Sequence, residues 1–303
     1  MGCGEMYLVL DIGGTFVKYA TMNLEGELLS KGRKPIAKDD LNSFCKMLFS
    51  VIEEHDLNQL EGIAMSCPGA VDPKTGIIYH GGSFPFLHEV NLVEIIQNKY
   101  QLSVTIENDA KCAALAELWL GSIKDKKDAI VLILGSAIGG GIIIDGKLHR
   151  GASLSAGEVS YINHRFNPET KEVGYFGLDC SAVEMVKKIA KLKNLKDETD
   201  GEAVFEYINS GDEQAMEVFD TYCNLIAIQI LNLHYVIDPE LIAIGGGISA
   251  QPILIERINQ AIDEIKKVND FHVATPHIVA CHFLNDANLY GALYHFEQSR
   301  KEE

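Results

Sequence analysis

The chain has 303 residues, of which 47% are hydrophobic and 23% charged, a normal globular composition that suits about two domains. Its formal net charge of −17 argues against a general nucleic-acid or anionic-membrane surface, because phosphate backbones and headgroups are bound by clustered cations. A small phosphorylated ligand, which needs only a local site, stays possible.

The N-terminus and the cysteines point to the cytoplasm. No basic segment precedes an apolar stretch, so we expect no export signal. Met1-Gly2-Cys3 resembles an acylation start, but Tyr7 stands near the place where Ser or Thr is needed. The least polar stretch, 129–144, is interrupted by Gly and Ser and is too short for a membrane span. Seven scattered cysteines without a CxxC pair are typical of reduced, mostly buried thiols.

Strand-like and helix-like patterns alternate along the chain. We predict strands at 7–12, 16–24, 27–31, 62–66, 104–106, 128–134, 140–145, 241–244 and 277–280. We predict helices at 41–55, 90–99, 110–120, 181–192, 202–208, 212–235, 252–266 and 287–298. A polar region from 149 to 174 has no predicted element. This alternation indicates an α/β fold.

A similar sequence pattern occurs once in each half of the chain. Residues 15–28 and 135–148, at a constant offset of 120, both begin with a small residue, continue as an apolar strand and end in an acid-Gly-polar-Leu turn. An apolar strand precedes each of them. A strand, a Gly-rich turn and a returning strand therefore occur twice, which is moderate evidence for a duplication.

A Gly-rich turn between two strands is either a plain hairpin or an anion site. Glycine lets the backbone approach a ligand closely, so that successive N–H groups converge on a phosphate. Asp11, just before Gly13-Gly14-Thr15, could hold Mg²⁺ through water, and the second Gly-rich turn strengthens the phosphate interpretation. Gly141 to Lys147 matches a P-loop by chance, because Leu148 replaces the required Ser or Thr and the context is strand–turn–strand.

Three polar residues, Glu107, Asn108 and Asp109, separate an apolar strand from an Ala-rich helix. Asn or Asp at this place is the preferred helix N-cap. A carboxylate here could instead act as a general base. The local pattern leaves both readings open, and Asn108 could cap while Asp109 catalyses.

Five motifs follow one another in the order and spacing of the ROK family of sugar kinases, and the chain resembles that family over nearly its whole length. They are DIGGT at 11–15, SCPGAVD at 66–72, END at 107–109, LGSAIGGGIIIDGKLHRGASLSAGE at 134–158 and IGGGIS at 244–249. The resemblance implies two actin-like (RNase H-like) α/β domains flanking a central cleft. The first would span 1–120 plus about 286–303 and the second 121–285. Only six residues precede the first strand, so we expect no N-terminal helix-turn-helix of the kind found in the family's repressors.

The resemblance also implies the reaction and the site. It implies ATP-dependent phosphorylation of a hexose or hexose derivative, at the 6-hydroxyl, with Asp109 as the general base, by a cytoplasmic homodimer. The implied sugar ligands are Asn108, Glu158, Gly69, Ser83 and Tyr161. The implied ATP and Mg²⁺ site comprises Asp11, Gly13, Gly14, Thr15, Gly135, Ser136, Gly245, Gly246 and Gly247, with Asp11 reaching Mg²⁺ through water.

The chain departs from the family pattern at its zinc motif and in one turn. Tyr161 occupies the place of the zinc-binding His of GE-x-x-H, and only Cys180 remains of the three cysteines of the CxCGxxGC segment. A structural zinc needs four N or S ligands, so we predict none and expect aromatic packing by Tyr161, Phe166, Tyr175 and Phe176 in its place. Ser136-Ala137 replaces the usual Thr-Gly.

Two other readings stay open beside the kinase. A sugar-binding regulator would keep the same fold without turnover, although it would have no need of Asp109. An acetate kinase of the same superfamily fits the END and GE motifs poorly. Glucose, mannose, fructose, N-acetylmannosamine and β-glucosides all remain candidate sugars.

Overall fold

The computed structural model describes residues 5–268, 271 and 273–302. Met1, Gly2 and Cys3 lie outside the described residues. The chain divides into two compact units. Unit 1 comprises 1–120, 150–155 and 286–303, and unit 2 comprises 121–149 and 156–285. The segment Arg150–Ser155, which the sequence analysis left in the second domain, thus belongs to unit 1.

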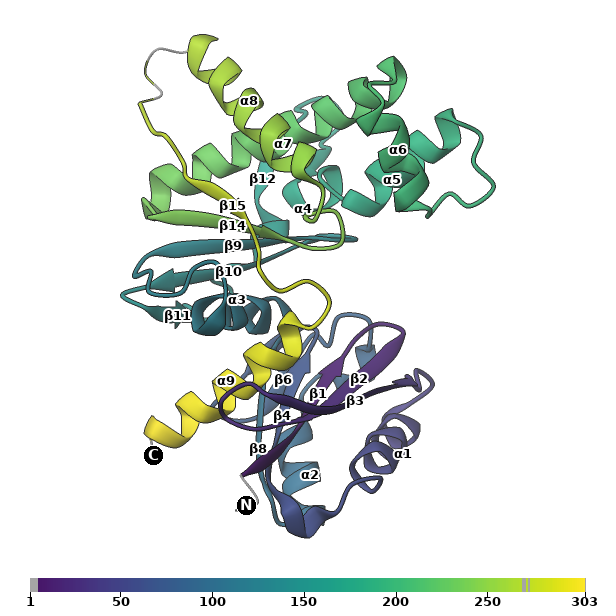
Figure 1. Cartoon of the computed structure of the whole chain (residues 1–303), viewed down its shortest axis with the longest axis vertical. Coiled ribbons are helices and arrows are strands. Elements are labelled where there is room, and N and C mark those ends of the chain that lie inside the picture. Colours follow the sequence, from purple (N-terminus) through teal and green to yellow (C-terminus); the bar gives the residue numbers. More distant parts are fainter. Residues whose placement is uncertain (1–4, 269–270, 272, 303) are drawn as a thin grey trace. The chain divides into compact units, whose positions relative to one another are not determined.

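Unit 1 is built on a five-stranded sheet of order β3-β2-β1-β4-β8 (Figure 1). Its strands are β1 (Met6–Ile12), β2 (Phe16–Met22), β3 (Leu28–Pro35), β4 (Leu60–Cys67) and β8 (Ser103–Asn108). A smaller sheet holds β5 (Ala70–Asp72), β6 (Ile77–Tyr79) and β7 (Val90–Asn91). The helices are α1 (Leu41–Ile52), α2 (Leu92–Tyr100), α3 (Asp109–Leu120) and α9 (Ala287–Glu302), with 3-10 turns η1 (Leu57–Gln59) and η2 (Pro85–Leu87).

Alternation along β1 sends side chains to two cores, one on each face of this sheet. Leu8 and Leu10 join a cluster that includes residues of α1 and α2. Tyr7 and Val9 join a second cluster that includes Cys112 of α3 and several residues of α9. The helix that follows the END motif and the closing helix therefore share one core.

Unit 2 has a five-stranded sheet of order β11-β10-β9-β14-β15. Its strands are β9 (Ala129–Leu134), β10 (Ile138–Ile144), β11 (Lys147–His149), β14 (Leu241–Gly245) and β15 (Ile278–Ala280), beside a hairpin of β12 (Asn163–Phe166) and β13 (Val173–Tyr175). The helices are α4 (Phe176–Asp179), α5 (Ala182–Leu192), α6 (Gly201–Asn209), α7 (Glu213–Ile237) and α8 (Pro252–Val268), with the 3-10 turn η3 (Val159–Tyr161). The core gathers inward residues of β9 and β14 with residues of α5, α7 and α8.

The two sheets have the same topology. In each, three antiparallel strands come first in the chain and two parallel strands extend the sheet beyond the first of them. The repeated sequence pattern therefore corresponds to a repeated strand order, as a duplication requires.

The structure corrects one sequence expectation and supports two others. The region 149–174 is not without regular structure, since it holds η3, β12 and most of β13, which are too short to produce a readable period. The run from Gly141 to Lys147 spans the β10–β11 hairpin, in which Ile144 pairs with Lys147, so it is not a P-loop. The six cysteines in the described part of the chain are all buried. No helix in that part is long and apolar enough to span a membrane.

Candidate active site

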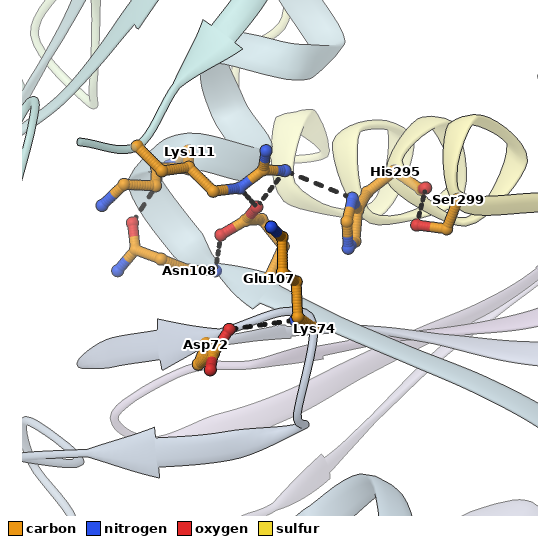
Figure 2. A network of polar contacts seen from close by, with 8 residues as sticks. Asp72, Lys74, Glu107, Asn108, Lys111, His295 and Ser299 are labelled. Carbon is orange, nitrogen blue, oxygen red and sulfur yellow. Dashed lines mark hydrogen bonds and ion pairs between the residues drawn. The ribbon is translucent and has the colours of Figure 1, made fainter. Parts of the chain in front are cut away.

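The END motif joins the edge strand β8 to helix α3, and Asn108 caps that helix. Its Oδ1 accepts the backbone N–H of Lys111 at 3.0 Å, and Figure 2 shows the Asn108 side chain beside Lys111. The Asn108 amide also donates to the carbonyl of Gly69 at 2.9 Å and to Oδ1 of Asp109 at 3.0 Å. Both N–H groups of the amide are thereby used, and Oδ1 keeps acceptor capacity.

Asp109 is the first residue of α3 and is partly exposed. Its Oδ1 accepts the backbone N–H of Ala110 at 2.8 Å as well as the amide of Asn108. A helix N-terminus also stabilises negative charge electrostatically. The capping role of Asn108 and a chemical role for Asp109 are therefore compatible, because separate side chains fill them.

Gly69 lies in a tight turn next to the segment that carries Ser83. Its φ is +103°, and a Cβ there would come within 2.5 Å of the carbonyl of His80, so only glycine fits. A Cβ on Gly82 would be 3.7 Å from the backbone nitrogen of Gly69. A Cβ on Gly14 would be 3.8 Å from Oγ of Ser83. The structure thus brings the first Gly-rich turn, Ser83, Gly69 and the END motif into one neighbourhood of unit 1.

Asp11 is a buried carboxylate at the end of β1, next to that turn. Its Oδ1 accepts from Oγ of Ser66 at 3.2 Å and from Nδ2 of Asn288 at 3.0 Å, and Nζ of Lys18 lies 3.5 Å from Oδ2. The turn itself is closed by a bond from the N–H of Gly13 to the carbonyl of Phe16 at 3.1 Å. Sequence reasoning found Asp11 but missed these three partners, which no motif marks.

Two buried thiols lie close to both aspartates. Burial, followed by the negative charges of Asp109 and Asp11, raises the pKa of the Cys67 thiol well above its usual value. The pKa of Cys112 is raised by burial first, then by Glu107, Asp11 and Asp109. Both thiols are therefore poor candidates for nucleophiles.

Unit 2 holds the second Gly-rich turn and the glycine run after β14. The carbonyl of Gly135 accepts the N–H of Ala182 at 3.0 Å, at the start of α5. Gly246 has φ +101°, and a Cβ there would meet the carbonyl oxygen of Leu134 at 2.1 Å. The runs at 135–136 and 245–247 therefore lie side by side. Ser136 and Gly247 are exposed.

Glu158 follows a turn that is fixed against β10. Gly140 and Gly157 are in close backbone contact, since a Cβ on Gly157 would be 2.7 Å from the carbonyl of Gly140. Ser160 Oγ accepts the N–H of Ile138 at 2.9 Å and donates to its carbonyl at 2.7 Å. The backbone on both sides of Glu158 is thus fixed against β10, on one side through Ser160, which no sequence motif marked.

The aromatic packing that was expected at residues 161–176 in place of a zinc site is largely wrong. Phe176 is fully buried, but Tyr161 is 74% exposed, Phe166 is 60% exposed and Tyr175 is also exposed. The β12–β13 hairpin and α4 are joined instead by a contact of 2.7 Å between Nε2 of His164 and Oδ2 of Asp179. Among the described residues, no group of three or more His, Cys, Asp or Glu could hold a metal ion.

Elemental analysis of protein purified without chelator is expected to give well under one zinc per chain, because His164 and Cys180 offer two ligands where structural zinc takes four. Stoichiometric zinc that survives dialysis would contradict this prediction.

Comparisons with known proteins find relatives that match nearly the whole chain. The model of the ROK family matches residues 7–299. A β-glucoside kinase of Listeria innocua is 35% identical over 299 residues, covering 96% of this chain and 98% of the relative. A β-glucoside kinase of Klebsiella pneumoniae is 30% identical, covering 95% of each chain. A solved ROK family protein from Streptococcus pneumoniae in complex with sucrose has 31% identity and a TM-score of 0.87, covering 98% of this chain and 100% of that one.

These matches define the class, an ATP-dependent sugar kinase built from two actin-like α/β domains, and so confirm the enzyme class and fold class predicted from the sequence. The chain belongs to the ROK family. The roles predicted for individual site residues stay predictions.

Proposed function

We propose that the chain transfers the γ-phosphoryl group of ATP to the 6-hydroxyl of a hexose unit, with Asp109 as general base. The observation that carries this proposal is the END motif, in which Asn108 caps α3 and two hydrogen bonds fix the Asp109 carboxylate. A bond forms between the sugar oxygen and the γ-phosphorus, the bond to the ADP oxygen breaks, and the hydroxyl proton passes to Asp109. Phosphoryl transfer depends chiefly on such positioning and on charge stabilisation.

The sugar would be bound by Asn108, Gly69, Ser83 and Glu158. Both N–H groups of the Asn108 amide are used within the protein. Asn108 therefore binds a sugar hydroxyl as an acceptor, through Oδ1. The Glu158 carboxylate can accept from two adjacent hydroxyls, and the fixed turn around it restricts its direction.

ATP would be held by the backbone of the two Gly-rich turns and of 245–247, with Ser136 supplying a hydroxyl. Asp11 suits an outer-sphere Mg²⁺, which keeps most of its waters and takes few carboxylate ligands. The Asp11 carboxylate already accepts hydrogen bonds from Ser66 and Asn288 and is paired with Lys18. Contact with Mg²⁺ through water therefore fits Asp11 better than direct coordination. When bound, Mg²⁺ would neutralise charge on the phosphates.

Among the candidate sugars we propose a β-glucoside. Three relatives of 30–35% identity are β-glucoside kinases, and a solved relative holds the disaccharide sucrose. Tyr161, three residues after Glu158, is exposed and would influence which substituents on the first and second sugar carbons fit. A second candidate is N-acetylmannosamine, favoured by the likeness to a putative N-acetylmannosamine kinase from Listeria monocytogenes (31% identity, TM-score 0.84).

A coupled ADP assay with Mg²⁺ and ATP tests the function. The panel contains cellobiose, methyl β-glucoside, sucrose, glucose, mannose, fructose and N-acetylmannosamine. We expect ADP release only with sugar, and the highest kcat/KM with a β-glucoside. If folded protein releases no sugar-dependent ADP but binds sugar in calorimetry, the regulator reading replaces the kinase.

Glu158→Ala is expected to weaken sugar binding roughly 10- to 100-fold, the value of a hydrogen bond to a charged group. The dissociation constant from calorimetry measures this effect. Glu169→Ala, in the exposed loop of the next hairpin, is the matched control and should bind sugar normally. Unchanged affinity in Glu158→Ala would remove Glu158 from the site.

We also keep a cytoplasmic location and a homodimer as proposals that follow from the family resemblance. Light scattering of the purified protein should give twice the chain mass of 33.3 kDa. A monomer mass at micromolar concentration would contradict the dimer.

A further inference from the structure

Glu107, the first residue of the END motif, is a fully buried carboxylate whose two oxygens have different partners. Oε2 accepts Nε and Nη2 of Arg150, both at 2.7 Å. Oε1 accepts the backbone N–H of Asn108 at 2.8 Å. Figure 2 shows Glu107 within this network, between Asn108 and His295. The side chain of Glu107 has no exposed surface, whereas that of Arg150 is 29% exposed.

This ion pair is not explained by stability alone. Burying a carboxylate is costly unless it is paired, and a buried ion pair is often no more stabilising than apolar residues of the same volume. An apolar side chain at position 107 would fill the same space, but it could not accept the N–H of Asn108. The Glu107 carboxylate therefore fixes the backbone orientation of Asn108, the residue that caps α3.

The position of β8 explains why the orientation of the Asn108 backbone matters. β8 is at the edge of its sheet, with β4 beside it, so within the described part of the chain strand pairing holds β8 on one side. At the C-terminal end of β8, the Glu107 side chain accepts the backbone N–H of Asn108. Asn108 caps α3, and the next residue, Asp109, is the proposed base. A shift of Glu107 moves the backbone from which Asn108 and Asp109 project.

Arg150 lies in a short segment of the chain that is packed with unit 1. It follows β11 directly, and 150–155 belongs to unit 1 although the chain on both sides belongs to unit 2. Its Nη2 lies 3.5 Å from Nδ1 of His295, a buried residue of α9. Because arginine has no hydrogen-bond acceptor, Nη2 of Arg150 donates and Nδ1 of His295 accepts. Arg150 thus connects the closing helix to the strand end of the END motif.

We propose that Arg150 is a positioning residue for phosphoryl transfer. Its guanidinium holds Glu107, and Glu107 holds the Asn108 backbone, so that the Asp109 carboxylate keeps its direction toward the reacting hydroxyl. Arg150 itself touches neither substrate nor nucleotide in this scheme. The inference rests on the proposed role of Asp109.

Arg150→Met is expected to lower kcat roughly 10- to 100-fold, because small misplacements of a catalytic group cost up to about this factor. The KM for sugar and for ATP should change less than threefold. Glu107→Gln should have a similar effect, and the double variant should lose no more than the worse single variant, because both act through one contact.

Arg257→Met is the matched control. Arg257 of α8 pairs with Asp220, its Nε donating to Oδ1 at 2.7 Å, and its side chain is 30% exposed, close to the value for Arg150. It lies in unit 2, outside the proposed site. Arg257→Met should lose a comparable amount of thermal stability and keep kcat. Equal kcat in both variants, with both folded, would overturn the proposal.

Two further measurements separate positioning from general damage. Arg150→Gly should regain at least part of its kcat with millimolar ethylguanidinium, which can replace the partly exposed guanidinium, whereas Glu107→Gln should not respond. Hydrogen exchange of a peptide covering 107–112 should accelerate in Arg150→Met and not in Arg257→Met. Faster exchange in a protein whose wild type phosphorylates no sugar would support the positioning contact and refute the kinase. Unchanged exchange and kcat in an active enzyme would refute the positioning contact alone.

Discussion

Replacing Asp109 by Asn is expected to lower kcat by about 10²- to 10⁴-fold, the usual contribution of a general base. The amide keeps an Oδ1 that can accept the N–H of Ala110, so the start of α3 should survive. It cannot take the proton of the sugar hydroxyl. Because the base acts in the transition state more than in the ground state, sugar affinity should fall far less than turnover.

Steady-state ADP release and calorimetric titration of sugar measure these two quantities separately. Asp39→Asn, an exposed aspartate before α1, is the matched control and should behave as wild type. Near-normal turnover in Asp109→Asn would leave Asp109 with a structural role only. A parallel loss of sugar binding and turnover would place its main contribution in the ground state.

Gly291→Ala should produce the largest loss of stability among single-methyl additions. Gly291 lies on α9 where this helix crosses α3, and a Cβ there would be 1.7 Å from the carbonyl oxygen of Cys112. Backbone cannot yield as a flexible side chain does, so α9 must move. Overpacking of this kind costs about 3 kcal/mol or more, which lowers Tm by roughly 6–12 °C for a unit of this size.

The consequences should extend to the site, because α9 also supplies Asn288 to Asp11 and His295 to Arg150. Thermal unfolding and ADP release should therefore both decline. Gly201→Ala makes the same chemical change at the start of α6, where nothing lies within 4 Å, and should leave Tm unchanged or slightly raised. A wild-type Tm in Gly291→Ala would show that the two helices are not in close contact.

Much of the fold could be predicted because long elements produce a clear period. Each long helix and every strand of the two large sheets except the three-residue β11 was expected close to its observed place, and the repeat at offset 120 anticipated the shared strand order. The short strands β5, β6, β7, β12 and β13 were missed, since two to four residues cannot show a period. The aromatic packing expected at 161–176 was wrong at three of its four residues, because hydrophobic character does not specify which side chains find a core.

Candidate site residues that belong to a sequence motif could be predicted. Residues that join the site only through a tertiary contact could not. Asp11, Gly69, Asn108, Asp109 and Glu158 each stand in a motif with a characteristic order. Arg150 stands 43 positions from Glu107, and His295 a further 145 from Arg150, so nothing in the local pattern joins them. Glu107 carried one signal, an acidic residue at the end of an apolar strand, but it gave no partner.

The sequence by itself determined the family, the α/β class, the repeated strand–turn–strand unit and the residue types available for sugar and phosphate, because these follow from local periodicity and from motifs read in order. Only the tertiary structure decided that Asn108 caps α3 while donating to Gly69, that the glycine runs at 135–136 and 245–247 lie side by side, and that Arg150 is bound to a fully buried Glu107. The physical reason is that these contacts join residues far apart in the chain. Their partners are selected by packing and by the cost of burying an unpaired charge, neither of which leaves a period in the sequence.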